Sequence, residues 1–465
     1  MTKLYREQIE NNPNFCIMPF AHNHVTTEGE VALCCLAAYN HRLGPRANVR
    51  DEKDLQKHWN GEFYKKIRQD MLDGKRVPEC HTCWRQDDQG PGSDRETANN
   101  MVYRNWPSDG TIIDEDWDIN IETGNSYNQP MWTDIRPGHT CNYKCRMCSP
   151  GISDSLDKEQ EKYPEIYAAA GAYAEGVLEP KKYSGLTFKE MSTWIEQEET
   201  INSLKKWINN EHYITMKLLG GEPLATQGCI KLIQWCVESG NTDFNLCITT
   251  NGSIAKGKIL SLLNQFRKVR IDFSGDSNLI LDPKVNEYQR KNASSAVMHE
   301  NFLGFKQIDG CTVNYLCATG IHNIFNIVNV LKYWREYGME KCNGPVGKLV
   351  INLIAWPQEF DIEILPEEHR LKIAQEIEEF LLEPEFAKLC DEVYGSHKFF
   401  SQSTRLDLLI NRLRNPTMSE EKILKLRKQC ARRTIAFDKI RNESFRDALH
   451  PVIVQLIDEW NNINA

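Results

Sequence analysis

The stretch TCNYKCRMCS, residues 140–149, places three cysteines within eight residues at the spacing C-x3-C-x2-C. A disulfide framework needs paired cysteines, and a closed structural zinc site needs four ligands. Three thiolates on a tight loop can instead bind three irons of a [4Fe–4S] cluster and leave the fourth iron open to a small molecule. We therefore take Cys141, Cys145 and Cys148 as candidate ligands of such a cluster. A zinc ion completed by a residue such as His139, or three unrelated thiols, are the alternatives.

The composition is that of an ordinary globular protein. The chain has 465 residues, of which 40% are hydrophobic and 26% charged, and this length allows two or three domains. The net charge of -9 disfavours nucleic acid as a partner. No apolar run approaches the ~20 residues that span a bilayer. We therefore expect a cytoplasmic protein without membrane contact, in which sixteen cysteines serve metal or cluster ligation rather than disulfides.

Short apolar runs that end in Gly, Pro, Asn or Ser predict six strands, at residues 132–138, 216–223, 244–252, 269–277, 313–320 and 348–357. Helical patterns at 229–240 and 322–338 lie between some of these runs. The order strand, helix, strand predicts a parallel sheet or barrel, whose ligand site collects at the C-terminal ends of the strands.

Changes in pattern along the chain predict four regions. A cysteine-bearing N-terminal domain is expected at 1–103, followed by an Asp-, Asn-, Gly- and Pro-rich linker at 104–131. The sheet or barrel is expected at 132–360, with an insertion at about 150–213. A helical segment is expected at 361–465; its clearest helices are 365–382 and 419–441, the latter capped by Ser419.

The sequence CNYKCRMC, which follows DIRPGHT, resembles the cluster-binding loop of the radical S-adenosylmethionine (SAM) superfamily. The resemblance implies an α/β fold built on a partial (β/α)6 barrel. It also implies that SAM chelates the open iron and is cleaved reductively to a 5′-deoxyadenosyl radical, which abstracts a hydrogen atom from the substrate. A reductant such as flavodoxin or ferredoxin is an implied partner.

The same resemblance suggests which residues bind SAM. The sequence GGEP at 220–223 is similar to the family's GGE motif, in which Gly220 and Gly221 allow close approach of the backbone and Glu222 pairs with the methionine ammonium. Met147 takes a position that is often aromatic in the family, and its thioether can pack against adenine. The other SAM-binding residues that the resemblance suggests are Asn251, Ser274, Asp276 and, as a partner of the carboxylate, Arg290. For Asn251, Ser274 and Asp276 the alternative is turn chemistry at strand ends.

The N-terminal region contains FCIMPFAHNHVTTEGEVALCC (15–35) and RQDMLDGKRVPECHTCW (68–84). The run C-x12-G-x4-C and the closing C-x2-C resemble the one-cluster, twitch-like form of the SPASM module, here placed before the barrel rather than after it. The resemblance implies a second, auxiliary [4Fe–4S] cluster, with the ligands Cys16, Cys34, Cys80 and Cys83. Cys35 in place of Cys34, ligation by His22 or His24, and a zinc ribbon on the same thiolates are the alternatives.

Relatives with this module modify ribosomally made peptides, proteins or small metabolites. We expect a net oxidation or crosslink on a peptide or protein substrate, with the auxiliary cluster relaying an electron. Modification of a small metabolite or nucleoside is the alternative within the same class. A non-catalytic metal-binding scaffold is the alternative from another class.

Two further segments carry polar residues whose role the sequence leaves open. Ser93, Arg95 and Asn99 could meet substrate, but a solvated polar loop is the expectation for 90–100. Basic residues fill 422–446 and are interleaved with apolar ones, which predicts a helix with a buried stripe and a charged outer face rather than an RNA-binding surface.

Overall fold

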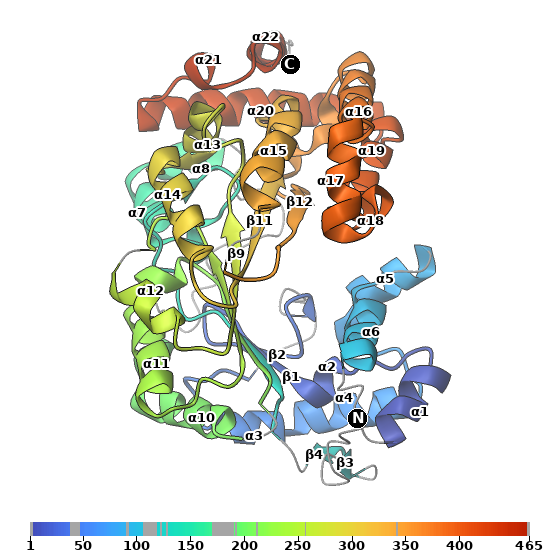
Figure 1. Ribbon diagram of the computed structural model, residues 1–465, viewed down its shortest axis with the longest axis vertical. Coiled ribbons are helices and arrows are strands. Elements are labelled where there is room, and N and C mark those ends of the chain that lie inside the picture. The colour runs from blue at the N-terminus through green and yellow to red at the C-terminus, as the bar shows by residue number, and fades with distance from the viewer. Residues whose placement is uncertain are drawn as a thin grey trace. The chain divides into compact units, whose positions relative to one another are not determined.

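The computed structural model (Figure 1) describes residues 3–37, 47–89, 93–105, 119–120, 123–126, 129–169, 190, 193–210, 213–255, 257–340 and 343–462. The chain forms two compact units, the first made of Met1–His139 with Leu186–Cys247 and the second of Thr140–Gly185 with Ile248–Ala465. Most of the linker expected at 104–131, and residues 170–189 of the expected insertion, lie outside the described residues.

In the first unit, three strands pair in parallel. β1 (His22–Val25) pairs with β5 (Trp132–Ile135), and β5 pairs with β7 (Thr215–Leu218). The short β2 (Val31–Ala32) is antiparallel to β1. His24, Asp134 and Lys217 are consecutive partners across the three parallel strands. A strand of the cysteine-bearing N-terminal region is therefore continuous with the sheet that the later strands build.

Along the chain, helices precede and follow the strands of the first unit. Asp54 caps α3 by accepting a hydrogen bond from the Gln56 amide. The described helices of this unit are α1 (Lys3–Asn11), α2 (Met18–Ala21), α3 (Leu55–Trp59), α4 (Glu62–Leu72), α5 (His81–Gln89), α6 (Asp94–Asn105), α10 (Glu198–Ile208) and α11 (Gln227–Glu238). The short β3 (Ile119–Asn120) and β4 (Asn125–Ser126) form a separate antiparallel pair.

In the second unit, β9 (Lys268–Ser274), β11 (Thr312–Thr319) and β12 (Leu349–Leu353) are parallel. Residues of β11 alternate between half-buried and buried, as one packed face requires. On the packed face the Tyr315 ring stacks on Phe273 at 5.9 Å and meets Phe302 of α14 (Ser295–Phe305) edge-on at 5.8 Å. This aromatic group fixes where β9 and β11 end, and so where their polar C-terminal residues lie.

All six strands predicted from the sequence are present; the sixth is β8 (Asn245–Thr250), in which the chain passes from one unit to the other. The helices predicted between strands are present as α11 and as α15 (Ile327–Tyr333), which continues in one π-helical turn, Trp334–Gly338. The expected α/β architecture with parallel strands is confirmed. The remaining described helices before residue 360 are α7 (Asp154–Lys162), α8 (Pro164–Ala169), α12 (Lys258–Leu263) and α13 (Pro283–Gln289).

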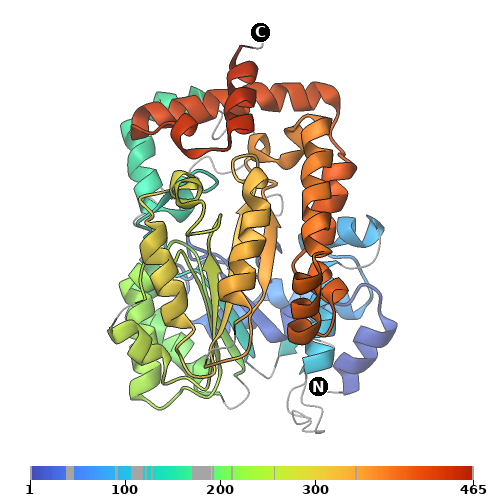
Figure 2. The same ribbon diagram turned by 45° about the horizontal axis from the view of Figure 1, so that its top comes forward.

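The C-terminal region is helical, as predicted. Ser419 caps α20 by accepting a hydrogen bond from the Lys422 amide, and α20 lies across one end of the second unit in both views (Figure 1 and Figure 2). Among the described residues, no helix is long and apolar enough to cross a membrane. The helices of the region are α16 (Glu367–Leu381), α17 (Pro384–Tyr394), α18 (His397–Ser403), α19 (Leu406–Arg414), α20 (Glu420–Arg441), α21 (Phe445–Ala448) and α22 (Pro451–Asn461).

The turn after β9 offers a test of this packing. A Cβ at Gly275 would overlap the Tyr315 hydroxyl, which itself donates to the Ser277 carbonyl. We expect Gly275→Ala to lower the free energy of unfolding by about 1–3 kcal/mol, because the buried ring has to move. Denaturant unfolding at equilibrium measures the change. Gly304→Ala in α14, where the added Cβ meets nothing closer than 3.8 Å, is the control and should be neutral or stabilising. Equal effects of the two substitutions would contradict the prediction.

Candidate functional site

The backbone of the three-cysteine loop is fixed at both ends. The two-residue strands β6 (Lys144–Cys145) and β10 (Arg290–Lys291) pair antiparallel, so that Cys145 lies opposite Arg290. The amide of Cys148 donates to the Cys145 carbonyl at 3.2 Å, which closes a tight turn between the second and third cysteines. At the other end, the Cys141 amide donates to Asp154 Oδ1 at 2.8 Å, at the start of α7.

Hydrogen-bond donors point at two of the three sulfurs. Asn251 Nδ2 lies 3.7 Å from Cys141 Sγ, and Arg290 Nη1 lies 3.9 Å from Cys145 Sγ. Cys141 and Cys145 are buried and Cys148 is half-buried. A hydrogen bond with Cys148 and burial both raise the pKa of Cys145. An amide and a guanidinium donor beside sulfur are what thiolate ligands of a metal or cluster need. The donor set therefore fits a cluster bound to this loop.

Asp276 holds the arginine beside the loop. Arg290 Nη2 lies 2.9 Å from Asp276 Oδ1, and Arg290 Nε lies 2.7 Å from Asp276 Oδ2, a bidentate pair that is almost fully buried. The Ala318 amide also donates to Asp276 Oδ1 at 3.0 Å. Burial on its own lowers the pKa of Arg290, but the charges of Asp276 and Cys145 outweigh it and raise the pKa. The guanidinium therefore stays charged and bridges a carboxylate and a candidate cluster ligand.

The structure thus brings together most of the predicted site residues of the second unit. Ser274 is the last residue of β9 and is half-buried, as is Met147 in the loop. Asn251 and Arg290 contact cysteines of the loop, and Asp276 contacts Arg290. The contacts of Ser274 and Met147 with SAM stay predictions.

The GGE motif belongs to the first unit and follows β7. Gly220 has φ +95°, and a Cβ there would lie 3.0 Å from Arg136 Cβ, so glycine is required. Gly221 is half-buried. Glu222 is fully buried, and its Oε1 accepts a hydrogen bond from the Leu224 amide at 3.0 Å. The structure therefore places the carboxylate at the C-terminal end of a parallel strand, as the sequence predicts.

The four N-terminal cysteines predicted as ligands lie near enough to one another for their charges to interact. Burial is the largest cause that raises the pKa of Cys80, and the charges of Cys16, Cys34 and Cys83 raise it further. Burial likewise raises the pKa of Cys16 to about 12. Backbone amides donate to three of these sulfurs: that of Met18 to Cys16, those of Leu36 and Ala37 to Cys34, and that of Arg95 to Cys83. Among the described residues, no three Cys, His, Asp or Glu side chains lie close enough to share a single metal ion.

The neighbouring alternatives, Cys35, His22 and His24, have other surroundings. After burial, the charges that act most on Cys35 are those of Asp134, Arg136 and Lys217, on or beside β5 and β7. His24 Nδ1 lies 3.4 Å from Asp134 Oδ1. His22 Nδ1 lies 3.0 Å from the Leu33 carbonyl oxygen. These contacts favour Cys34 over Cys35 and the histidines as the fourth ligand.

The expectation of a solvated loop at 90–100 is wrong from Ser93 onward. Ser93, Arg95 and Asn99 are buried, and α6 begins at Asp94. Asn99 accepts from the Ile17 amide and donates to the Phe15 carbonyl, both at 2.9 Å, and Arg95 Nη1 donates to the same carbonyl at 2.9 Å. These residues fix the backbone on both sides of Cys16. The i, i+4 spacing of Arg95 and Asn99 on one helical face is the signal that could have revealed them.

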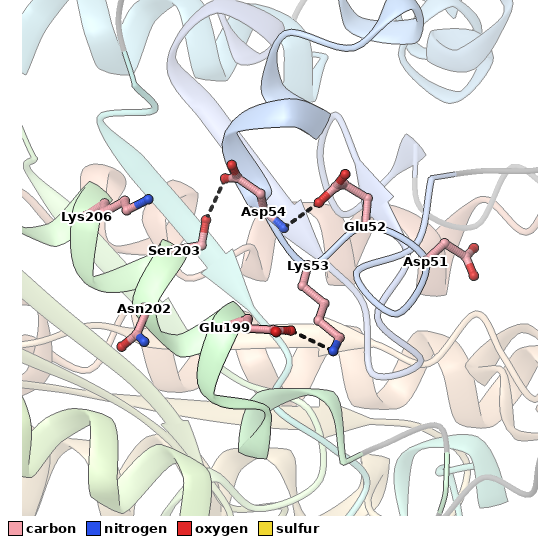
Figure 3. Close-up of a pocket in the computed structure, with 8 residues that line it drawn as sticks. All are labelled: Asp51, Glu52, Lys53, Asp54, Glu199, Asn202, Ser203 and Lys206. Carbon is pink, nitrogen blue, oxygen red and sulfur yellow. Dashed lines mark hydrogen bonds and ion pairs between the residues drawn. The ribbon is translucent and has the colours of Figure 1, made fainter.

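A pocket of about 480 Å³ lies in the first unit, between α10 and the loop that precedes α3 (Figure 3). Lys53 Nζ lies 2.6 Å from Glu199, and Ser203 Oγ donates to Asp54 Oδ1 at 3.1 Å while it accepts from the Leu55 amide. These polar groups pair with one another and so link α10 to the loop before α3 and to the first residue of α3. Its lining, which contains none of the predicted site residues, is Asp51, Glu52, Lys53, Asp54, Glu199, Asn202, Ser203 and Lys206.

The adjacent cysteines provide a matched pair of variants. We expect Cys34→Ala to lower bound iron from about eight to about four per chain, because the auxiliary cluster loses a ligand. Cys35→Ala should leave iron unchanged, since its side chain lies among the charges of β5 and β7. Iron and acid-labile sulfide per chain, measured after anaerobic reconstitution, test the pair. Loss of iron in Cys35→Ala alone would reverse the ligand assignment.

Three comparisons place the chain among known proteins. Residues 16–84 match the family SPASM, described as an iron-sulfur cluster-binding domain. No curated protein matches the chain. Solved structures that match include Streptococcus suis SuiB bound to the precursor peptide SuiA, at 13% identity, with 78% of this chain and 69% of that chain covered and a TM-score of 0.33. SuiB bound to S-adenosylmethionine matches at 13% identity with a TM-score of 0.31, with 78% of this chain and 68% of that chain covered.

The family match confirms the prediction that the N-terminal cysteines belong to an iron–sulfur module of the SPASM kind. The matched residues, 16–84, include Cys16, Cys34, Cys80 and Cys83, the four thiols predicted as ligands. The match covers this N-terminal region of the chain, and the three-cysteine loop at 140–149 lies beyond it.

Proposed function

We propose that the protein is a radical SAM enzyme that carries out a net oxidation or crosslink on a peptide or protein substrate. The observation that carries the proposal is the pair of donors directed at the loop sulfurs, Asn251 at Cys141 and Arg290 at Cys145. Both donors are also held by partners of their own, since Asn251 donates to Asn142 Oδ1 and Arg290 pairs with Asp276, so they are ordered beside the sulfurs. Beside thiolates that ligate a cluster, they offset the negative charge.

Each cysteine group of the chain has a part in the proposal. Cys141, Cys145 and Cys148 hold three irons of one [4Fe–4S] cluster, and Cys16, Cys34, Cys80 and Cys83 hold the auxiliary cluster. When loaded, the first site with SAM supplies a 5′-deoxyadenosyl radical for hydrogen abstraction, and the second supplies an electron carrier. A small reductant protein, such as flavodoxin or ferredoxin, is the proposed partner.

The proposed contacts with SAM follow the resemblance residue by residue. Glu222 is a buried carboxylate that accepts one backbone hydrogen bond through Oε1, which makes it suited to an ammonium group. Arg290 stays charged because Asp276 holds it, so it can orient the SAM carboxylate without drifting from Cys145. Asn251, Ser274, Gly220, Gly221 and Met147 complete the proposed contacts. We propose a peptide or protein substrate because relatives that carry the SPASM module modify such substrates.

Two cysteine variants test the two clusters separately. We expect a protein with Cys141, Cys145 and Cys148 all changed to Ala to retain about four irons and four sulfides, because the N-terminal ligands remain. It should no longer convert SAM to 5′-deoxyadenosine under reducing anaerobic conditions. The reciprocal variant, Cys80→Ala with Cys83→Ala, should keep a cluster on the loop and the slow conversion of SAM.

The outcomes separate the alternatives. Loss of all iron in the triple variant would leave a one-cluster protein and remove the electron-carrier role. Zinc in place of iron in that variant would support the zinc ribbon. If the wild-type protein, loaded with clusters, formed no 5′-deoxyadenosine at all, the non-catalytic scaffold would replace the enzyme.

Glu222 offers a second test. Glu222→Gln keeps the shape of the side chain but removes the charge, so we expect SAM to bind about 10–100-fold more weakly, since a charge-assisted hydrogen bond is lost. The dissociation constant from equilibrium dialysis of the loaded protein measures this. Glu238→Gln, on the exposed end of α11, is the control and should bind SAM as the wild type does. Unchanged affinity in Glu222→Gln would remove Glu222 from the site.

A further inference from the structure

Helix α20 contacts the backbone of the three-cysteine loop on both sides of Cys145. Arg441 Nη1 donates to the Lys144 carbonyl at 2.9 Å, and Arg433 Nη2 donates to the Arg146 carbonyl at 3.3 Å. The two arginines lie almost three hundred residues beyond the loop in sequence. The C-terminal segment therefore binds both carbonyls that flank a candidate cluster ligand, in addition to the pairing of β6 with β10.

The loop reaches back to the helix through its own arginine. Arg146 has no exposed side-chain surface, and its Nη2 lies 2.5 Å from Asp438 Oδ1 of α20 and 2.8 Å from Glu443 Oε2. Arg146 Nε donates to the Tyr288 carbonyl at 3.0 Å, and the guanidinium lies over the Tyr288 ring at 3.7 Å. The Tyr288 hydroxyl donates to Asp438 as well, at 2.7 Å. The Asp438 carboxylate therefore accepts hydrogen bonds from both the loop, through Arg146, and α13, through Tyr288.

A third link joins α20 to the helix that fixes Cys141. Arg441 Nη2 lies 2.7 Å from Glu159 Oε1 in α7, and both side chains are almost fully buried. The first turn of α7 binds the peptide groups on both sides of Cys141, through Asp154 and through Ser155, whose hydroxyl donates to the Cys141 carbonyl at 2.7 Å. Arg441 thus connects α7, which holds Cys141, with Lys144, the residue before Cys145.

Stability alone does not explain so many buried charges. Removing charged groups from water costs free energy that their mutual attraction often only balances, whereas the geometry they impose is specific. Arg433 illustrates this, because its Nη1 lies 2.8 Å from the buried Glu359 while Nη2 is directed to the loop. An apolar contact between α20 and the loop could hold them together but would not set the carbonyl directions.

We propose that α20 positions the three-cysteine loop, with Arg433, Asp438 and Arg441 as positioning residues of the cluster site. The proposal rests on the proposed function, because it takes this loop as the ligand of a cluster. The helix holds the cysteines in the geometry that receives iron, so that the C-terminal segment belongs to the site and is not an appended domain. The charged face expected to be the outer face of α20 is turned inward at these positions.

The test uses Arg441→Gln and the isosteric Asp438→Asn in the full-length, cluster-loaded protein. We expect iron to leave the loop about 10–100-fold faster in the presence of bathophenanthroline, as loss of an outer-shell partner does in other metal sites. The electron paramagnetic resonance spectrum of the reduced protein should also change less on addition of SAM, because the open iron is displaced. Thermal unfolding of the cluster-free variants shows whether they fold.

Lys439→Gln is the matched control, since Lys439 is on the same helix turn as Asp438 and Arg441 but is exposed. It should release iron at the wild-type rate. If both test variants fold and behave like Lys439→Gln, the positioning role is wrong while the cluster assignment stands. If the wild-type loop binds no cluster, both the proposed function and this inference fail. If Arg441→Gln does not fold, Asp438→Asn decides alone.

Discussion

The buried ion pair between Arg146 and Asp438 is the constraint on which the arrangement of the second unit depends. Arg146 lies within the loop, one residue after Cys145, and its side chain is drawn into a site formed by α13 and α20. A loop of this length could adopt many conformations. With Arg146 held on one side and Cys141 held by α7 on the other, the loop is fixed where Asn251 and Arg290 donate to the sulfurs of Cys141 and Cys145.

Charge balance explains why this region tolerates buried arginines. Every arginine near the loop has a carboxylate within 3 Å: Arg290 has Asp276, Arg433 has Glu359, and Arg441 has Glu159. Each is therefore paired before any cluster binds, and none needs to move when one does. An anionic cluster with its thiolates then enters surroundings whose positive groups are already ordered, which removes a reorganisation cost from binding.

Local patterns in the sequence predicted most of what is local in the structure. Each of the six strands is a short apolar run with a turn residue after it, and the structure has all six. The helix at 419–441 was predicted with its cap, Ser419. The cysteines of the loop were identified by their spacing alone, because ligands of one cluster can be close in sequence.

What the sequence did not reveal depends on contacts between distant residues. Arg433 and Arg441 have the same residue type as the exposed Arg432, so a charge pattern cannot tell which of them turns inward; the partner carboxylates, Glu359 and Glu159, decide it. In the same way, Cys34 and Cys35 are adjacent residues of the same type, so the sequence pattern alone cannot tell which of them is the ligand. Strand β2 ends just before them, and only the folded turn separates a thiol among cysteines from a thiol among the charges of β5 and β7.

The two cysteine groups differ in the kind of donor that faces their sulfurs, and the difference matches the roles proposed for them. In the N-terminal group, backbone amides of Met18 and Arg95 donate to Cys16 and Cys83. Backbone donors are fixed by the fold and change little when a ligand binds nearby. In the loop, side chains of Asn251 and Arg290 donate to Cys141 and Cys145, and both come from strand ends or from the short β10. The side-chain donors of the loop are held in place by other side chains, Asn251 by Asn142 and Arg290 by Asp276, whereas the backbone donors of the N-terminal group suit a closed cluster with a constant environment.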